Sequence, residues 1–143
     1  MTKDKALYRW LNNAVHNWEV PITDGAASDP VKTDAFIPAY PSTSVPDNAA
    51  LPYLTYDAPD AAFDGGPVSM TLYLWFRTKF ETVPNAAVRE LSETLGYGGA
   101  RIPCDNGVIW LLRGTPFSRP VPEPERYLKG RYVNITAQYL TTN

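Results

Sequence analysis

The stretch GVIWLLRGTPFSRPVPEPERYLKGRYVNITAQYL, residues 107–140, decides the fold class of this 143-residue chain. Val108 to Leu112 is a continuous apolar run, which is typical of a strand buried on both faces. Arg131 to Leu140 alternates apolar with polar residues, as a strand with one buried face does. Residues 114–130 between them predict a long, proline-rich loop. Neither the strands nor the loop carries a catalytic constellation, which favours assembly over chemistry.

Three upstream segments extend this pattern. Apolar residues from Thr2 to Trp18 recur at the spacing of one helical face and predict an amphipathic helix. Val68 to Arg77 alternates strictly and is the clearest strand, with Tyr73 and Trp75 opposite its aliphatic face. Rings of that size predict that a second layer or a neighbouring subunit covers them. A second helix follows from Thr82 and ends at a glycine cap, Gly96.

The remaining segments have less regular patterns. Pro21 to Pro52 is expected to be mostly loop, with residues 36–40 at a sheet edge if they pair at all. Pro52 to Tyr56 predicts a strand, and Asp105 to Gly107 predicts a hairpin turn after a strand at Arg101 to Cys104. The expected fold is α+β: one domain, residues 1–143, with one mixed, mostly antiparallel β-sheet of four to five strands packed by two α-helices.

Composition narrows the classes of partner. The formal net charge is −2 with both signs scattered, which gives no electrostatic footprint for nucleic acid or for an anionic membrane. The single cysteine excludes an intrachain disulfide and a thiolate cluster within one copy. Because no signal peptide and no apolar run of about 20 residues is present, we expect a soluble protein made in the cytoplasm.

Candidate catalytic groups are sparse. His16 is the only histidine, and the spacing places it on the surface of the first helix. Cys104 has no basic neighbour in sequence that would lower its pKa, so an inert thiol is expected. Asp57, Asp60 and Asp64 lack the spacing of a calcium loop and are interpreted as turn residues. We therefore expect no enzyme and no catalytic, cofactor or metal residues.

The proline-rich loop is the best candidate for an interface, because prolines reduce the entropy lost on docking and arginine pairs bidentately with carboxylates. The alternative is a solvated connection between strands. The candidate interface residues are Arg113, Arg119, Glu123, Glu125, Arg126, Arg131, Tyr73 and Trp75. A different hypothesis makes Tyr73, Trp75, Trp110 and Tyr139 a stacking platform for sugars or bases, although such rings more often belong to a core.

The chain resembles phage tail completion, or tail terminator, proteins of long-tailed phages and prophages. The likeness lies in the N-terminal amphipathic helix, the approach VPDNAALPYLTYDA, the strand VSMTLYLWFR, the helix after Val83 and the GTPFSRP to NITAQYL ending. The run VPEPERYLKG departs from it, since a more acidic loop is expected in that family.

The resemblance implies a small subunit that forms a ring, commonly hexameric, on the completed tail tube and ends tube polymerisation. Its partners would be copies of itself, the tail tube protein and the head connector, with no direct nucleic-acid recognition and no membrane. It would lie at the head-proximal end of the virion tail and in the host cytoplasm during assembly. Two alternatives stay open: a head-closure or connector subunit, and a monomeric, β-rich carbohydrate-binding module.

Overall fold

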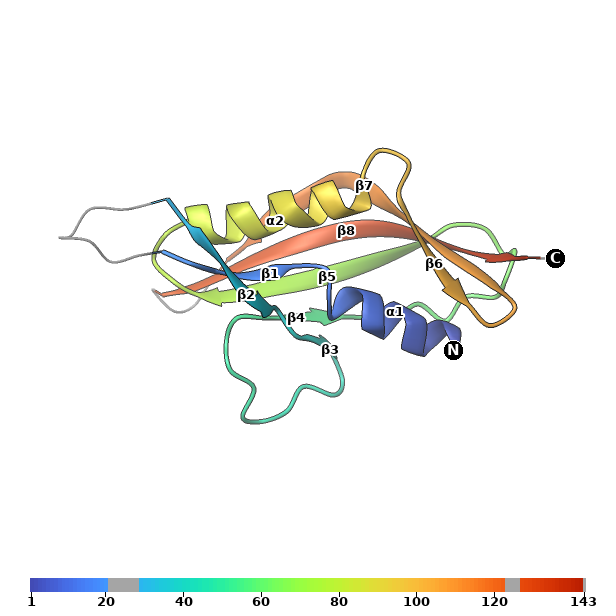
Figure 1. Ribbon diagram of the computed structural model, residues 1–143, viewed down its shortest axis with the longest axis horizontal. Coiled ribbons are helices and arrows are strands. Elements are labelled where there is room, and N and C mark those ends of the chain that lie inside the picture. The colour runs from blue at the N-terminus through green and yellow to red at the C-terminus, as the bar shows by residue number, and fades with distance from the viewer. Residues whose placement is uncertain (21–28, 123–126, 143) are drawn as a thin grey trace.

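The computed structural model describes residues 1–20, 29–122 and 127–142 (Figure 1). Its main element is a six-stranded sheet with the strand order β3-β4-β5-β8-β7-β6. All neighbouring strands in this sheet are antiparallel except β3 and β4, which are parallel. The strands are β3 (Ala39–Pro41), β4 (Tyr53–Tyr56), β5 (Val68–Arg77), β6 (Ala100–Cys104), β7 (Gly107–Val121) and β8 (Leu128–Thr141).

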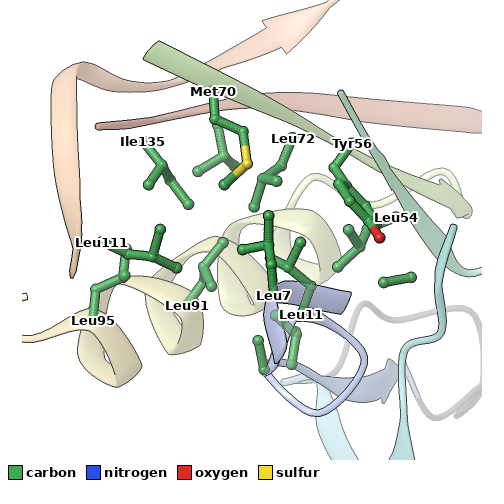
Figure 2. Close-up of a cluster of buried hydrophobic side chains, with 14 of the residues drawn as sticks. Leu7, Leu11, Leu54, Tyr56, Met70, Leu72, Leu91, Leu95, Leu111 and Ile135 are labelled. Carbon is green, nitrogen blue, oxygen red and sulfur yellow. The ribbon is translucent and has the colours of Figure 1, made fainter. Parts of the chain in front are cut away.

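Two helices pack against one face of this sheet, and a small pair of strands contacts the second helix. The helices are α1 (Lys3–Leu11) and α2 (Thr82–Leu95), and β1 (His16–Glu19) pairs with β2 (Val31–Phe36) in a separate two-stranded sheet. Side chains from both helices point toward those of β4, β5, β7 and β8 and form the core (Figure 2). The α+β class and the two helices are confirmed, but the main sheet has six strands instead of four or five, and a second sheet is present.

Strand β5 shows why the core lies on one face. Met70, Leu72, Leu74 and Phe76 are at most 2% exposed, whereas the residues between them are half-buried or exposed. The same alternation runs along β8, where Val133 and Ile135 are buried. Both strands therefore have a core face and an outer face, as their period of two predicted. The outer face is the one turned away from the helices.

The predicted loop at residues 114–130 is wrong in its extent. Strand β7 continues to Val121 and β8 begins at Leu128, so residues 118–121 and 128–130 of this segment are paired sheet. The register passes from Arg113 opposite Ile135 to Ser118 opposite Val133, which leaves residues 114–117 as a bulge opposite Asn134. The side-chain amide of Asn134 donates to the Pro116 carbonyl oxygen at 2.9 Å, which satisfies a backbone acceptor that the ladder does not use. Prolines sit in this strand because the bulge and the open edge relax the demand for N–H donors.

The first helix is shorter than its apolar spacing predicted. It ends at Leu11, and the Asn12 backbone N–H caps it by donating to the Tyr8 carbonyl oxygen at 2.9 Å. Trp18 lies in β1 instead of on the helix. Apolar residues at helical spacing also suit a chain that crosses the same core in extended form, so periodicity alone could not locate the helix end.

Residues 21–52 were expected to be mostly loop, and within the described residues 29–52 only 31–36 (β2) and 39–41 (β3) are strands, the latter at a sheet edge as proposed. One prediction about β7 needs correction. Strand β7 is buried on one face only: Ile109 and Leu111 are 0% exposed, while Val108, Trp110 and Leu112 are half-buried. The continuous apolar run at the start of β7 therefore forms a strand with one core face and one partly exposed face. The hairpin turn at residues 105–106 is confirmed, with Asn106 at φ 69°.

Candidate functional site

The outer face of the sheet carries a group of aromatic side chains at the end where β3 and β4 pair. One row crosses five strands in register, because each residue is the pairing partner of the next. The row reads Tyr40, Thr55, Tyr73, Tyr132 and Arg119. In the neighbouring row, Tyr53 is the partner of Trp75. We call Tyr40, Tyr53, Tyr73, Trp75, Tyr132 and Arg119 the aromatic patch.

The rings of the aromatic patch support one another. Tyr73 and Tyr132 lie 5.0 Å apart between centroids with their planes at 71°, an edge-to-face contact. Tyr40 and Tyr53 make a similar contact at 5.9 Å and 70°. Thr55, which lies between Tyr40 and Tyr73 in the row, is only 9% exposed. The strands beneath fix the spacing of the rings, so the patch is a preformed surface.

Trp75 depends on a glycine in the neighbouring strand. Gly130 is its pairing partner on β8, and a Cβ at that position would lie 2.7 Å from a carbon of the indole ring. The indole therefore lies across the backbone of β8, in the space that a side chain would fill. Val121 of β7 is 8% exposed beside the same glycine. This packing holds Trp75 in one orientation.

The aromatic patch is suited to contact with the surface of another molecule. All five rings are half-buried, so each has one part packed on the sheet and another open to a partner. Arg119, at the end of the row, is exposed. Half-exposed Tyr and Trp next to Arg is the composition that anchors protein interfaces. Within residues 1–20, 29–122 and 127–142 no second layer covers Tyr73 and Trp75, because the helices pack on the other face. Covering by a neighbouring subunit, the other alternative, stays a prediction.

The predicted interface arginines separate into different places. Arg119 joins the aromatic patch, whereas Arg113 lies on the core face of β7 and donates to the Ser92 hydroxyl at 2.9 Å. Its guanidinium also lies 5.2 Å from the centre of the Tyr97 ring, which is fully exposed after α2. Glu123, Glu125 and Arg126 lie outside the described residues.

Arg131 is 6% exposed and is engaged within the chain. It forms an ion pair with Glu81, next to the start of α2, and donates to Asn85 at 3.2 Å and to the Gly130 carbonyl oxygen at 2.9 Å. The hydrogen bond from Arg131 lowers the pKa of the Glu81 carboxyl, and burial opposes it only in part. We therefore assign Arg131 to anchoring α2 on the sheet.

The proposed four-ring platform is divided between the two faces. Trp110 lies on the outer face of β7, where its indole N–H donates to the Gly98 carbonyl oxygen at 2.7 Å and Arg101 stacks on its ring at 5.7 Å. Tyr139 is 2% exposed on the core face, and burial raises the pKa of its hydroxyl. Tyr40, Tyr53 and Tyr132 complete the surface instead. Only the pairing register brings them together, and the sequence did not reveal that register.

His16 lies in a polar cluster that the sequence did not predict. It belongs to β1, not to a helix surface, and its ring nitrogen Nδ1 lies 2.7 Å from a carboxylate oxygen of Glu90 on α2. The His16 backbone N–H, the Trp18 indole N–H and the Lys32 ammonium also donate to Glu90, at 3.0, 3.2 and 2.6 Å. One carboxylate, 11% exposed, thus joins the β1–β2 hairpin to α2. The residues next to Glu90 in the sequence do not indicate this cluster, because all partners of the Glu90 carboxylate are more than 50 residues away along the chain.

This cluster gives the protein an acid-sensitive contact. Burial raises the pKa of the Glu90 carboxyl, but hydrogen bonds from Lys32 and His16 outweigh it and bring the pKa below its ordinary value of 4.5. A lowered pKa in the folded state contributes stability above pH 4.5 that is lost as the pH falls through the folded pKa. Glu81 and Asp64 have lowered pKa values too and act in the same direction.

We expect Glu90→Gln to reduce the free energy of unfolding by about 1–3 kcal/mol at neutral pH, because several donors lose a charged acceptor. The variant should also lose less stability than the wild type between neutral pH and pH 3. Urea unfolding at a series of pH values measures both effects. Glu93→Gln, an exposed position one turn later on α2, is the matched control. Parallel pH profiles for Glu90→Gln and the wild type would contradict this role.

No group of three or more His, Cys, Asp or Glu side chains that could hold a metal ion occurs in the described part of the chain. Burial, followed by the Asp105 charge, raises the pKa of the Cys104 thiol, which is the environment of an inert cysteine. A hollow of about 400 Å³ between α1 and β6 is lined mainly by apolar side chains, among them Trp10, Ile102 and Pro103.

Comparison with known proteins identifies no family for this chain. No family model, no curated protein and no solved structure matches it. Among the helices of the described residues, none has the length and apolar character needed to cross a membrane. We therefore infer the function from the geometry of the aromatic patch and from the resemblance in the sequence.

Proposed function

We propose that this protein is a structural subunit of a phage tail, which caps the tail tube, ends its polymerisation and joins the tail to the head as part of a ring. One observation carries the proposal: a preformed, half-exposed aromatic patch occupies the outer face of the sheet. A large patch of partly exposed rings on a globular domain marks a surface that binds another protein. The resemblance to tail completion proteins indicates which protein that is.

The contact with the tube follows from the form of the patch. Its rings are spread across four neighbouring strands and are not gathered in a cleft, so they suit the broad, flat end of a protein tube better than a small ligand. Tyr and Trp at such positions supply most of the binding free energy of an interface. Arg119 adds a cation that can pair with a carboxylate of the tube subunit.

A carbohydrate-binding module is the second candidate, and the same patch favours it. Flat rings on a strand face also stack against sugar rings. The two functions differ in their partner: a sugar module binds glycans as a monomer, whereas a tail subunit binds the tube protein and copies of itself. Glycan-array binding and gel filtration of the purified protein separate the two candidates.

The decisive test is the length of tails assembled without the protein, measured by negative-stain electron microscopy. Loss of a tail terminator should give overlong tubes of variable length. Normal tails that fail to attach to heads would instead indicate the head-closure or connector role. Tails of normal length that attach to heads normally would contradict the proposal. Re-expression of the wild-type chain should restore the length and is the control.

A further inference from the structure

The two edges of the main sheet carry opposite charge. Strand β6 pairs only with residues 107–111 of β7, so the remainder of β7 continues the same edge. Strands β6 and β7 contain three arginines, all exposed, and no carboxylate; Asp105 in the turn between them is paired with the N-terminal ammonium. The arginines are Arg101, Arg113 and Arg119. We call this side the arginine edge.

The other edge is acidic. Residues 37–60, which include β3, β4 and the segment that joins them, contain three aspartates and neither lysine nor arginine. Asp47 lies between β3 and β4, and Asp57 directly follows β4. Both are exposed, and Asp57 accepts a hydrogen bond from the Ser42 hydroxyl. We call this side the aspartate edge.

Both edges are poor templates for adding another strand. The arginine edge contains Pro103, Pro116 and Pro120, which have no N–H to donate, and the bulge at residues 114–117 interrupts it. The aspartate edge is a strand of three residues that ends at Pro41. Short edge strands with proline resist backbone pairing between molecules. A neighbouring molecule must therefore be held by side-chain contacts and not by backbone pairing between the two sheets.

We propose that copies of this chain associate head to tail, with the arginine edge of one copy against the aspartate edge of the next. This inference rests on the proposed ring and says how its neighbours recognise one another. Opposite charges on opposite edges match in a head-to-tail contact, whereas like edges repel in a two-fold contact. The arrangement leaves the five rings of the aromatic patch, on the sheet face, for the tail tube, and Arg119 lies at the end of the row, where the two contacts meet.

Charge exchange between the edges tests the inference. The first variant carries Arg101→Glu with Arg119→Glu, the second carries Asp47→Lys with Asp57→Lys, and the third carries all four. Arg113 is left unchanged because it holds Ser92. Sedimentation velocity at increasing protein concentration measures self-association, and thermal unfolding shows whether each variant is folded.

We expect the wild type to self-associate about tenfold more weakly in 0.5 M than in 0.05 M salt, because exposed charges are screened. Each two-site variant should weaken association by about 100-fold or more, since like charges then face each other. The four-site variant should recover association to within about tenfold of the wild type, because its edges are again complementary. Lys5→Glu with Arg89→Glu changes the net charge as the first variant does, on the exposed surface of the helices, and should have little effect.

Three results would overturn the inference: a wild type that stays monomeric at all concentrations, two-site variants that associate like the wild type, or a folded four-site variant that stays monomeric. The function proposed above is tested separately by tail length. Overlong tails without the protein, combined with association that ignores these charges, would uphold the tail function and reject the edge contact. Charge-dependent association with normal tails would do the reverse.

Discussion

Leu72→Ala should lower the free energy of unfolding by about 2–5 kcal/mol. Leu72 is 0% exposed at the middle of β5, where its side chain points into the core between the sheet and the helices (Figure 2). Truncation removes buried apolar surface and leaves a cavity that the rigid sheet cannot close. Urea unfolding followed by circular dichroism measures the loss.

Thr71→Ala is the matched control, because Thr71 is the preceding residue on the outer face and is only half-buried. Its hydroxyl makes one long hydrogen bond, at 3.4 Å to Asn134, so we expect a loss of about 1 kcal/mol or less. Equal losses for the two variants would show that the two faces of β5 do not differ as described.

Tyr73→Thr should have the opposite effect, with little loss of stability and a large loss of binding. Threonine, like tyrosine, is favoured in strands, but it removes a ring of the aromatic patch and its contact with Tyr132. That contact is worth about 0.5–1.5 kcal/mol, so the fold should persist. If the ring is an anchor for the tail tube, the affinity for tube ends should fall about 30-fold or more, the effect of losing an interface hot spot of about 2 kcal/mol.

Binding of the purified variant to isolated tail tubes, followed by co-sedimentation, measures this loss. Tyr8→Thr removes an exposed tyrosine from α1, on the helical side, and should bind as the wild type does. Equal binding by Tyr73→Thr and the wild type would remove the patch from the tube contact, and equal weakening by Tyr8→Thr would place the contact elsewhere.

Local patterns in the sequence predicted the strands, helix ends and turns whose conformation is set by nearby residues. The alternation in Val68–Arg77 predicted both the bounds of β5 and its core face. The glycine after Leu95 predicted the end of α2, and Gly96 has the positive φ of 70° that such an end uses. The hairpin turn between β6 and β7 followed from residues 105–107 in the same way.

What the sequence could not supply was the pairing of distant segments. The aromatic patch exists because Tyr40, Tyr73 and Tyr132 fall in one row, and this depends on the register of strands more than 30 residues apart. The prolines of residues 114–130 indicated a loop because proline is rare in central strands. Here the bulge and the half-open edge of β7 accommodate them, a tertiary circumstance that no local pattern reports.

We propose that the outer face of the sheet meets the tail tube. Site-specific photo-crosslinking tests it most directly, with the reactive residue placed at Tyr132 in the patch or at Lys5 on the helical side, in the presence of assembled tubes. We predict a covalent adduct with the tail tube subunit from position 132 and none from position 5. An adduct from position 5 with none from position 132 would contradict the claim.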